Sequence, residues 1–191
     1  MIQEASEIID IALSQTDSSA DVHKWAAIII DEHCGMVSLE HRVKHSALVR
    51  DHLEKACQLN PRDFSAHYML GKWCYDMSQL SWFQRMVAKY LLASEPPRST
   101  YQQAYLHLSK AEELSPRTFV PNVYLLGRVC IETGYFYKAK YYLNMTLNLP
   151  ARDKCDRCCA EQARNLIKKL DRYDVSKLVL FYEENPFGLN D

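Results

Sequence analysis

The chain of 191 residues is long enough for one domain, and its 48% hydrophobic and 25% charged residues are ordinary for a globular protein. No apolar run approaches the ~18 residues of a membrane span, and the N-terminus lacks the basic and apolar regions of a secretory signal. The seven cysteines are scattered and odd in number, so we expect reduced intracellular thiols rather than a disulfide framework.

The net charge of −1 hides an uneven distribution of charge along the chain. Residues 1–60 carry 5 basic and 10 acidic side chains, whereas residues 117–172 carry 11 basic and 5 acidic ones. A distinctly basic segment in a neutral protein indicates either an anionic partner on that side or a solvated face without a partner.

Helices are predicted throughout, because no stretch shows the long period-two alternation of a strand. Asp63 and Thr118 each follow a proline by two residues and are natural N-caps, Ser99 with Gln102 forms a capping-box pattern, and Gly134 lies where a hairpin turn is needed. The helices are expected near residues 2–15, 20–33, 38–59, 64–77, 80–93, 100–114, 119–132, 136–148 and 153–172.

An internal repeat organises the chain. Residues 52–64 align without gaps on residues 107–119 with eight of thirteen identities, and each copy is followed by a Leu-Gly pair, at Gly71 and Gly127. A helix that ends in Leu-x-Pro and a next helix that carries Leu-Gly are typical of tetratricopeptide repeats. The prediction is therefore an all-α, tetratricopeptide-like helical-hairpin stack (an α-α superhelix) over residues 1–173, with a tail over 174–191 that is docked or flexible.

Two additions to the stack are predicted, an inserted helix and a C-terminal capping helix. Gly71 and Ala111 are 40 residues apart, where an ordinary repeat needs about 19. The inserted helix is either amphipathic and meant for a membrane surface or partner, or it buries its apolar stripe against the stack. We expect burial, because exposing so many large apolar groups is costly; the stripe is Trp82, Phe83, Met86, Val87, Tyr90 and Leu91.

A concave groove is expected along the first helix of each hairpin. The motif spacing predicts six groove residues, which are Tyr68, Lys72, Tyr75, Tyr124, Arg128 and Ile131. Two cations flanked by tyrosines suit an acidic peptide or the phosphate of an anionic phospholipid headgroup. The alternative is that the tyrosines pack between neighbouring hairpins while the cations point to water.

The last predicted helix has an apolar stripe and a basic face. Cys159, Ala163, Leu166, Ile167 and Leu170 form the stripe, and the basic residues lie mainly on the other side: Arg157, Arg164, Lys168, Lys169 and Arg172. The basic face predicts contact with an acidic partner by charge attraction, or else a polar outer face that only keeps a capping helix soluble. Nucleic acid is not expected, because no stacking aromatics or reading motif are interleaved.

Neither a metal site nor a catalytic site is predicted. Cys155 and Cys158 form a C-x-x-C pair, but no second ligand pair follows, and Cys155 is placed with Cys159 on the apolar stripe. His41, His45 and His52 fall along one side of their helix and could in principle hold a metal, but without carboxylates or cysteines on the same face they are expected to face solvent. No phosphate-binding, dinucleotide-binding, zinc-protease or nucleophile-elbow motif is present. We therefore expect a protein that is not an enzyme and has no cofactor.

The central block resembles the regulator of microtubule dynamics family. The resemblance covers roughly residues 5–170 and rests on His-Lys-Trp at 23–25, Gly-Lys-Trp-Cys-Tyr at 71–75, Trp-Phe-Gln-Arg at 82–85, Ala-Lys at 88–89, Pro-Pro-Arg-Ser-Thr-Tyr at 96–101 and Ala-Glu-Glu-Leu-Ser-Pro at 111–116. It implies a tetratricopeptide-like fold, association with microtubules and a role at the mitotic spindle. One membrane-anchored branch of the family tethers organelles, and its helical domain binds phospholipid.

The resemblance implies a non-enzymatic scaffold in the cytoplasm that binds tubulin, or spindle-associated proteins, on microtubules, the spindle and spindle poles. The alternative is a phospholipid-binding or lipid-transfer module of a membrane contact site. The chain lacks the anchoring segment of the organelle branch, which favours the cytoskeletal role. The cysteine cluster at 155–159 and the tail after Tyr173 are not family features.

Overall fold

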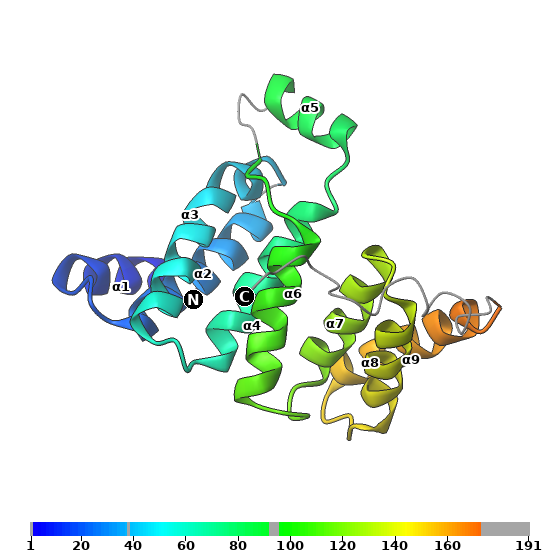
Figure 1. Ribbon diagram of the computed structural model, residues 1–191. Helices are drawn as coiled ribbons and strands as arrows, with labels where there is room; N and C mark the ends of the chain where they lie inside the picture. The colour runs from blue at the N-terminus through cyan, green and yellow to red at the C-terminus, as the bar shows by residue number, and fades with distance from the viewer. Residues whose placement is uncertain (1, 38, 92–95, 173–191) are drawn as a thin grey trace, which may run out of the picture. The chain divides into compact units, whose positions relative to one another are not determined.

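The computed structural model describes residues 2–37, 39–91 and 96–172, and over these ranges the chain is all-α (Figure 1). No strand occurs in them. The predicted helices are confirmed, with ends that move by a few residues; the predicted tail over 174–191 lies outside the described residues. The helices are α1 (Ile2–Gln15), α2 (Ala20–Val37), α3 (Leu39–Leu59), α4 (Phe64–Ser78), α5 (Trp82–Leu91), α6 (Tyr101–Leu114), α7 (Val120–Glu132), α8 (Phe136–Asn148) and α9 (Lys154–Leu170).

The helices divide into two compact units. The first contains α1 to α5 and ends at Thr100, and the second begins at Tyr101 and contains α6 to α9. One continuous repeat domain over residues 1–173 stays a prediction.

The first unit is built on the hairpin of α2 and α3, which pack on each other more extensively than any other pair in that unit (Figure 1). Helix α1 packs on α2, and α4 packs on α3. Small buried side chains allow this close approach. At most 1% of the surface of each is exposed: Ala26 and Ala27 on α2, Ala56 on α3 and Ala66 on α4. A polar bond also joins the helices, because the indole nitrogen of Trp73 on α4 donates to the Ser46 carbonyl on α3 (3.0 Å).

Asp63 caps α4, as predicted. Its carboxylate accepts hydrogen bonds from the backbone N–H groups of Ser65 (2.9 Å) and Ala66 (3.4 Å), which have no partner within the helix. The same carboxylate forms an ion pair with Lys24 on α2. One aspartate therefore starts α4 and fixes it to α2.

Helix α5 begins with a capping box that the sequence analysis missed. The backbone N–H of Ser81 donates to the Gln84 side-chain oxygen (2.8 Å), and the Gln84 N–H donates to the Ser81 hydroxyl (3.2 Å). Arg85 then donates to the carbonyls of Met77 (2.6 Å), Pro96 (3.0 Å) and Pro97 (3.1 Å). These polar bonds tie α5 to the end of α4 and to the segment that follows α5.

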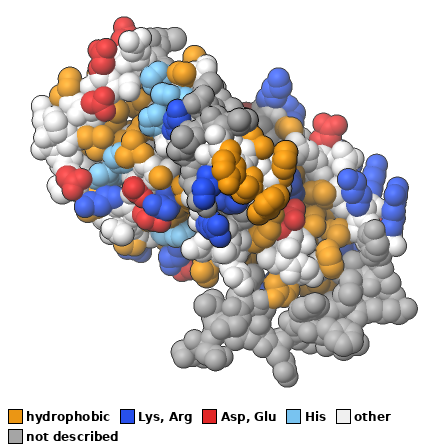
Figure 2. Space-filling view, turned by 90° about the horizontal axis from the view of Figure 1, so that it is seen from above, with side chains coloured by type: hydrophobic (Ala, Val, Ile, Leu, Met, Phe, Trp, Pro, Cys, Tyr) orange, Lys and Arg blue, Asp and Glu red, His pale blue; other side chains and the backbone are white. Residues whose placement is uncertain are grey.

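The prediction that α5 buries its apolar stripe is wrong for its largest members. Trp82, Phe83 and Tyr90 are 74%, 69% and 73% exposed, while the small side chain of Ala88 is buried. The physical reason is that α5 is held through Arg85 rather than through its aromatic groups. Figure 2 is seen from above Figure 1, where α5 lies at the top, and shows hydrophobic side chains at the surface beside lysine and arginine side chains.

The second unit packs α6, α8 and α9 around α7. Its core includes Tyr124 and Cys130 from α7, Leu143 from α8 and Ala163 from α9. Gly127 meets α8 so closely that a Cβ atom there would lie 2.8 Å from the Leu143 side chain, so the Leu-Gly pair of the second copy marks a close contact between helices.

Of the two turns that flank α7, one agrees with its sequence prediction and the other does not. Gly134 has φ +81° in the turn before α8, as a hairpin turn there requires. Thr118 is not the N-cap of α7, as predicted; the cap position is Phe119, without a side-chain hydrogen bond. The Thr118 hydroxyl instead donates to the Ser115 carbonyl (2.9 Å) inside a turn where Arg117 adopts φ +56°. The helix therefore begins one residue later than the threonine suggests.

Candidate functional site

The basic residues of α9 form one exposed face, here called the α9 basic face: Arg157, Arg164, Lys168, Lys169 and, just after the helix, Arg172. The opposite side carries the predicted apolar stripe, in which Cys159, Ala163 and Leu170 are buried and Leu166 and Ile167 are half-buried against the core. The amphipathic character of α9 is thus confirmed. Its role as a microtubule contact stays a prediction.

Polar groups at its two ends position α9. The Asp153 carboxylate caps the helix by accepting from the Asp156 N–H (2.8 Å), and the buried Asp156 carboxylate accepts from the Arg152 N–H (2.9 Å). Lys168 and Lys169 occupy the last turn, where cations interact favourably with the helix dipole. The two carboxylates at the start of α9 and the two lysines at its end therefore both complement the helix dipole.

Ion pairing distinguishes the cations of the α9 basic face from Lys140 nearby. Among residues 2–172 that the structure describes, no ion pair joins any of the five to a carboxylate. Lys140 on α8, by contrast, pairs with Asp171 (2.6 Å), so this nearby carboxylate is already engaged and does not neutralise the α9 cations. Since the five charges lie on one helix face, their fields add on the solvent side of α9.

Three predicted groove residues lie on α4. Lys72 is exposed and forms an i,i+4 ion pair with Asp76 (2.6 Å), Tyr75 is 6% exposed, and Tyr68 is half-buried. The other three lie on α7, in the second unit, so a groove shared by all six stays a prediction.

On α7, the predicted groove residues take part in packing. Tyr124 is buried, and its hydroxyl donates to the Gln162 side-chain oxygen on α9 (2.6 Å) and accepts from Arg128 (3.2 Å). Ile131 is half-buried against the core of the unit. Tyr124 therefore joins α7 to α9, which matches the alternative that a tyrosine at this position packs between neighbouring helices.

A cavity of about 590 Å³ lies within the first unit, lined by residues of α2, α3 and α4 with Leu80 and Pro96. Its lining is largely apolar but includes Asp31, Glu32, Arg42, Lys72 and Asp76. Arg42 donates to both carboxylate oxygens of Asp31 (2.9 and 2.7 Å), and Lys72 pairs with Asp76. Both cations of the cavity are thus neutralised, and Glu32 leaves it net negative. Of these five charged residues, only Lys72 was predicted to bind a ligand, because the sequence does not show that side chains from three helices meet here.

The sequence of the chain matches a known protein family along most of its length. The family model described as "Regulator of microtubule dynamics protein 1-3" matches residues 1–171 of the chain. The chain belongs to the regulator of microtubule dynamics family. It is similar to regulator of microtubule dynamics protein 1 of Mus musculus (32% identical over 170 residues, 89% of this chain and 55% of that protein) and of Bos taurus (31% over 168 residues, 88% and 53%). It is also similar to regulator of microtubule dynamics protein 3 of Xenopus laevis (33% over 158 residues, 81% and 33%).

The chain spans about half the length of the protein 1 relatives and a third of the protein 3 relative. The match confirms the family resemblance of the central block, which it includes in full. None of the helices in the described part of this family member combines the length and apolar character that crossing a membrane requires.

The cysteines and histidines of this family member depart from two expectations. Cys155 is exposed and does not belong to the buried stripe of α9, and Cys158 is exposed beside Gln162, whose amide donates to its sulfur (3.1 Å). The histidines expected to face solvent are half-buried. His52 lies against His23 of α2, with 2.9 Å between their Nδ1 atoms, and burial followed by the His23 charge lowers the pKa of His52.

Proposed function

We propose that this protein is a non-catalytic microtubule-associated scaffold that contacts acidic surfaces of tubulin through the α9 basic face. The observation that carries the proposal is a row of five exposed cations without ion pairs among the described residues, on a helix whose other side is fixed in a core. The family to which the chain belongs supports a role in microtubule dynamics. Charge attraction of this kind steers association and weakens as salt rises.

The wider form of the proposal places the protein in the cytoplasm, on microtubules, the mitotic spindle and spindle poles. A tetratricopeptide-like groove with Lys72 and Arg128 would then take an acidic segment of a spindle-associated partner. Both cations carry partners already, Asp76 for Lys72 and the Tyr124 hydroxyl for Arg128, so an incoming carboxylate has to compete with them. The α9 basic face has no competing carboxylate among the residues that the structure describes, and it is the stronger candidate contact.

The alternative of a phospholipid-binding module is not supported by the charge of the cavity in the first unit. An anionic headgroup gains most from cations that are available to it. Arg42 and Lys72 are each paired with a carboxylate, and Glu32 adds a further negative charge to the lining. The charge of this cavity therefore opposes an anionic headgroup.

Co-sedimentation with polymerised tubulin tests the proposal. The triple variant Arg164→Glu, Lys168→Glu, Arg172→Glu should bind at least about tenfold more weakly, which corresponds to about 1.4 kcal/mol. Binding of the unaltered protein should also fall as salt is added, because exposed charges are screened.

A matched control separates the α9 basic face from net charge. Arg62→Glu, Lys44→Glu, Lys89→Glu changes the net charge by the same amount through three exposed cations of the first unit, and it should bind as the unaltered protein does. Equal loss in both triple variants, or no loss in the α9 variant, refutes the assignment to α9. Native mass spectrometry decides the alternative, since a co-purified phospholipid would favour the lipid-binding module.

A further inference from the structure

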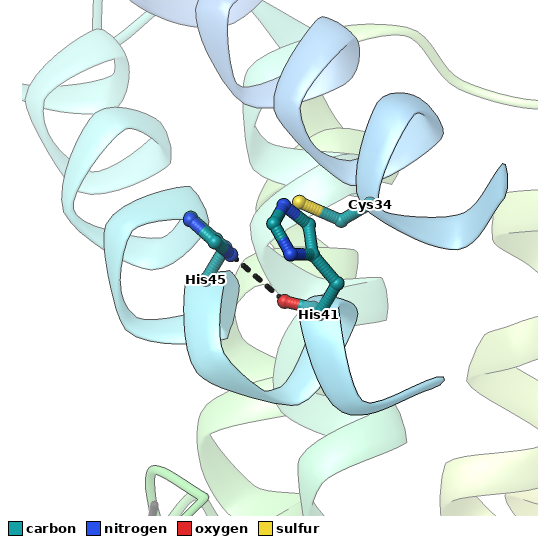
Figure 3. Close-up of side chains that lie close together, drawn as sticks. All are labelled: Cys34, His41 and His45. Carbon is teal, nitrogen blue, oxygen red and sulfur yellow. Dashed lines mark hydrogen bonds between the residues drawn. The ribbon is translucent and has the colours of Figure 1, made fainter. Parts of the chain in front are cut away.

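Three potential metal ligands meet at the closed end of the α2–α3 hairpin. Cys34 lies near the end of α2, and His41 and His45 lie in the first two turns of α3 (Figure 3). One donor atom from each side chain can be chosen so that all three lie within 4.8 Å of one another. Within the described part of the chain, no other group of three histidine, cysteine or acidic side chains is this compact.

The hairpin brings this cluster together in a defined way. His41 and His45 are four residues apart, so their side chains lie one turn apart on the same face of α3, and their ring centroids are 4.2 Å apart. Cys34 is 3% exposed because it faces this side of α3 rather than water. Figure 3 shows its sulfur next to the His41 ring. All three residues belong to the most extensively packed helix pair of the first unit, which holds them in place.

The tautomer of the His45 ring is indicated by its backbone neighbour. Its Nδ1 lies 2.8 Å from the His41 carbonyl oxygen, as the dashed line in Figure 3 marks. A carbonyl oxygen only accepts, so Nδ1 carries the proton and Nε2 of the neutral ring keeps a free lone pair. A hydrogen bond from the second ring nitrogen to a backbone carbonyl is the usual support of a histidine metal ligand. Coordination through Nε2 retains this bond.

The arginine next to His41 in the sequence does not oppose a metal ion at this point. Arg42 follows His41 in the chain, but its guanidinium donates to both oxygens of the Asp31 carboxylate. The charge of Arg42 is therefore balanced within the same helix pair. His33 lies one position before Cys34, with its ring centroid 6.3 Å from that of His41, and is a natural control for the cluster.

We propose that Cys34, His41 and His45 bind one Zn²⁺ ion, through the Cys34 sulfur and one nitrogen of each histidine. One thiolate and two imidazoles are ligands that zinc prefers, and water or an external donor completes the tetrahedron. Ligand atoms of a tetrahedral zinc ion lie about 3.5 Å apart. Side-chain rotations that move the donor atoms by about 1 Å would therefore close the site. The bound ion would link the end of α2 to the start of α3 and stabilise the hairpin.

Metal titration of the full chain tests the site. Metal-free protein should bind one equivalent of Zn²⁺ in competition with a chromophoric chelator, and its Tm should rise on binding. With Co²⁺ as the probe, a thiolate-to-cobalt charge-transfer band should appear. Cys34→Ser should abolish that band, and Cys34→Ser and His45→Gln should each weaken Zn²⁺ binding by at least about tenfold.

Two controls and one direct measurement make the result decisive. His33→Gln and the double variant Cys155→Ser, Cys158→Ser should keep both the band and the affinity, because these residues lie outside the cluster. X-ray absorption on the zinc-loaded unaltered protein should show one sulfur and two imidazole ligands, whatever the folding of the variants. No stoichiometric binding, a band that survives Cys34→Ser, or an equal loss in His33→Gln would overturn this ligand set.

Discussion

Gly127 shows how much a single residue controls in the second unit. A methyl group at this position would lie 2.8 Å from two carbon atoms of Leu143, whose side chain is fully buried in the core. Gly35 on α2 is the opposite case, since an added Cβ there meets nothing within 4 Å. The same substitution is therefore expected to have opposite effects at the two positions.

Gly127→Ala should destabilise the protein by up to about 2 kcal/mol, because overpacking against Leu143 costs about 1–3 kcal/mol and the helix propensity of alanine recovers only roughly 1 kcal/mol of it. Gly35→Ala should leave the free energy of unfolding unchanged or raise it by up to about 1 kcal/mol. Urea unfolding of both variants with a chelator present measures the difference. Equal stability of the two variants would show that α7 and α8 do not approach as closely as described.

At the scale of the element, the sequence predicted where helices lie better than what covers them. The positions of the helices and the cap at Asp63 follow from turn and capping residues, which act locally. The apolar pattern of α5 showed that one side of that helix is hydrophobic, but no local signal says which neighbour covers it, and its aromatic groups are exposed. Helical spacing likewise grouped His52 with His41 and His45, because it cannot show that Cys34 approaches from another helix.

The start of α4 should give a pH-dependent contribution to stability. Burial by itself would raise the pKa of Asp63, but hydrogen bonds from Lys24 and Ser65 outweigh it, so the pKa is lowered below 3.8. A carboxyl group with a lowered pKa stabilises the fold above its unfolded pKa, and this stabilisation is lost as pH falls through the folded pKa.

Asp63→Asn keeps a capping acceptor and removes the charge. Its stability deficit relative to the unaltered protein should be full at about pH 5 and above and should shrink toward about pH 2. Asp63→Ala should cost about 1 kcal/mol more at neutral pH, because the cap is lost as well. Unfolding free energies across this pH range measure both effects; a deficit that stays constant down to the lowest pH would contradict the role of the Asp63 charge.

Over the whole molecule, the seven cysteines fall into an exposed group and a buried group, and neighbours in the sequence can belong to different groups. Cys155 and Cys158 are exposed, and the other five are buried. Burial raises the pKa of Cys57, Cys130 and Cys159 to about 12, so these thiols are protonated at neutral pH. Helical spacing placed Cys155 and Cys159 on the apolar stripe of α9, and this is right for Cys159 and wrong for Cys155, which lies in the first turn and is exposed.

Alkylation of the native protein with iodoacetamide at neutral pH should give two adducts quickly, at Cys155 and Cys158. The remaining five thiols should react only after denaturation. Intact-mass measurements over time, followed by peptide mapping, distinguish these outcomes. Rapid modification of a third cysteine in the native protein would show that a thiol described as buried is accessible.

The two sides of α9 have a consequence for how family members can diverge. Residues that hold the helix in place are separate from those that carry its outward charge, so replacing a lysine there leaves the core as it was. Selection can therefore raise or lower affinity for an acidic partner stepwise, by exchanging single surface side chains, without first having to rescue folding.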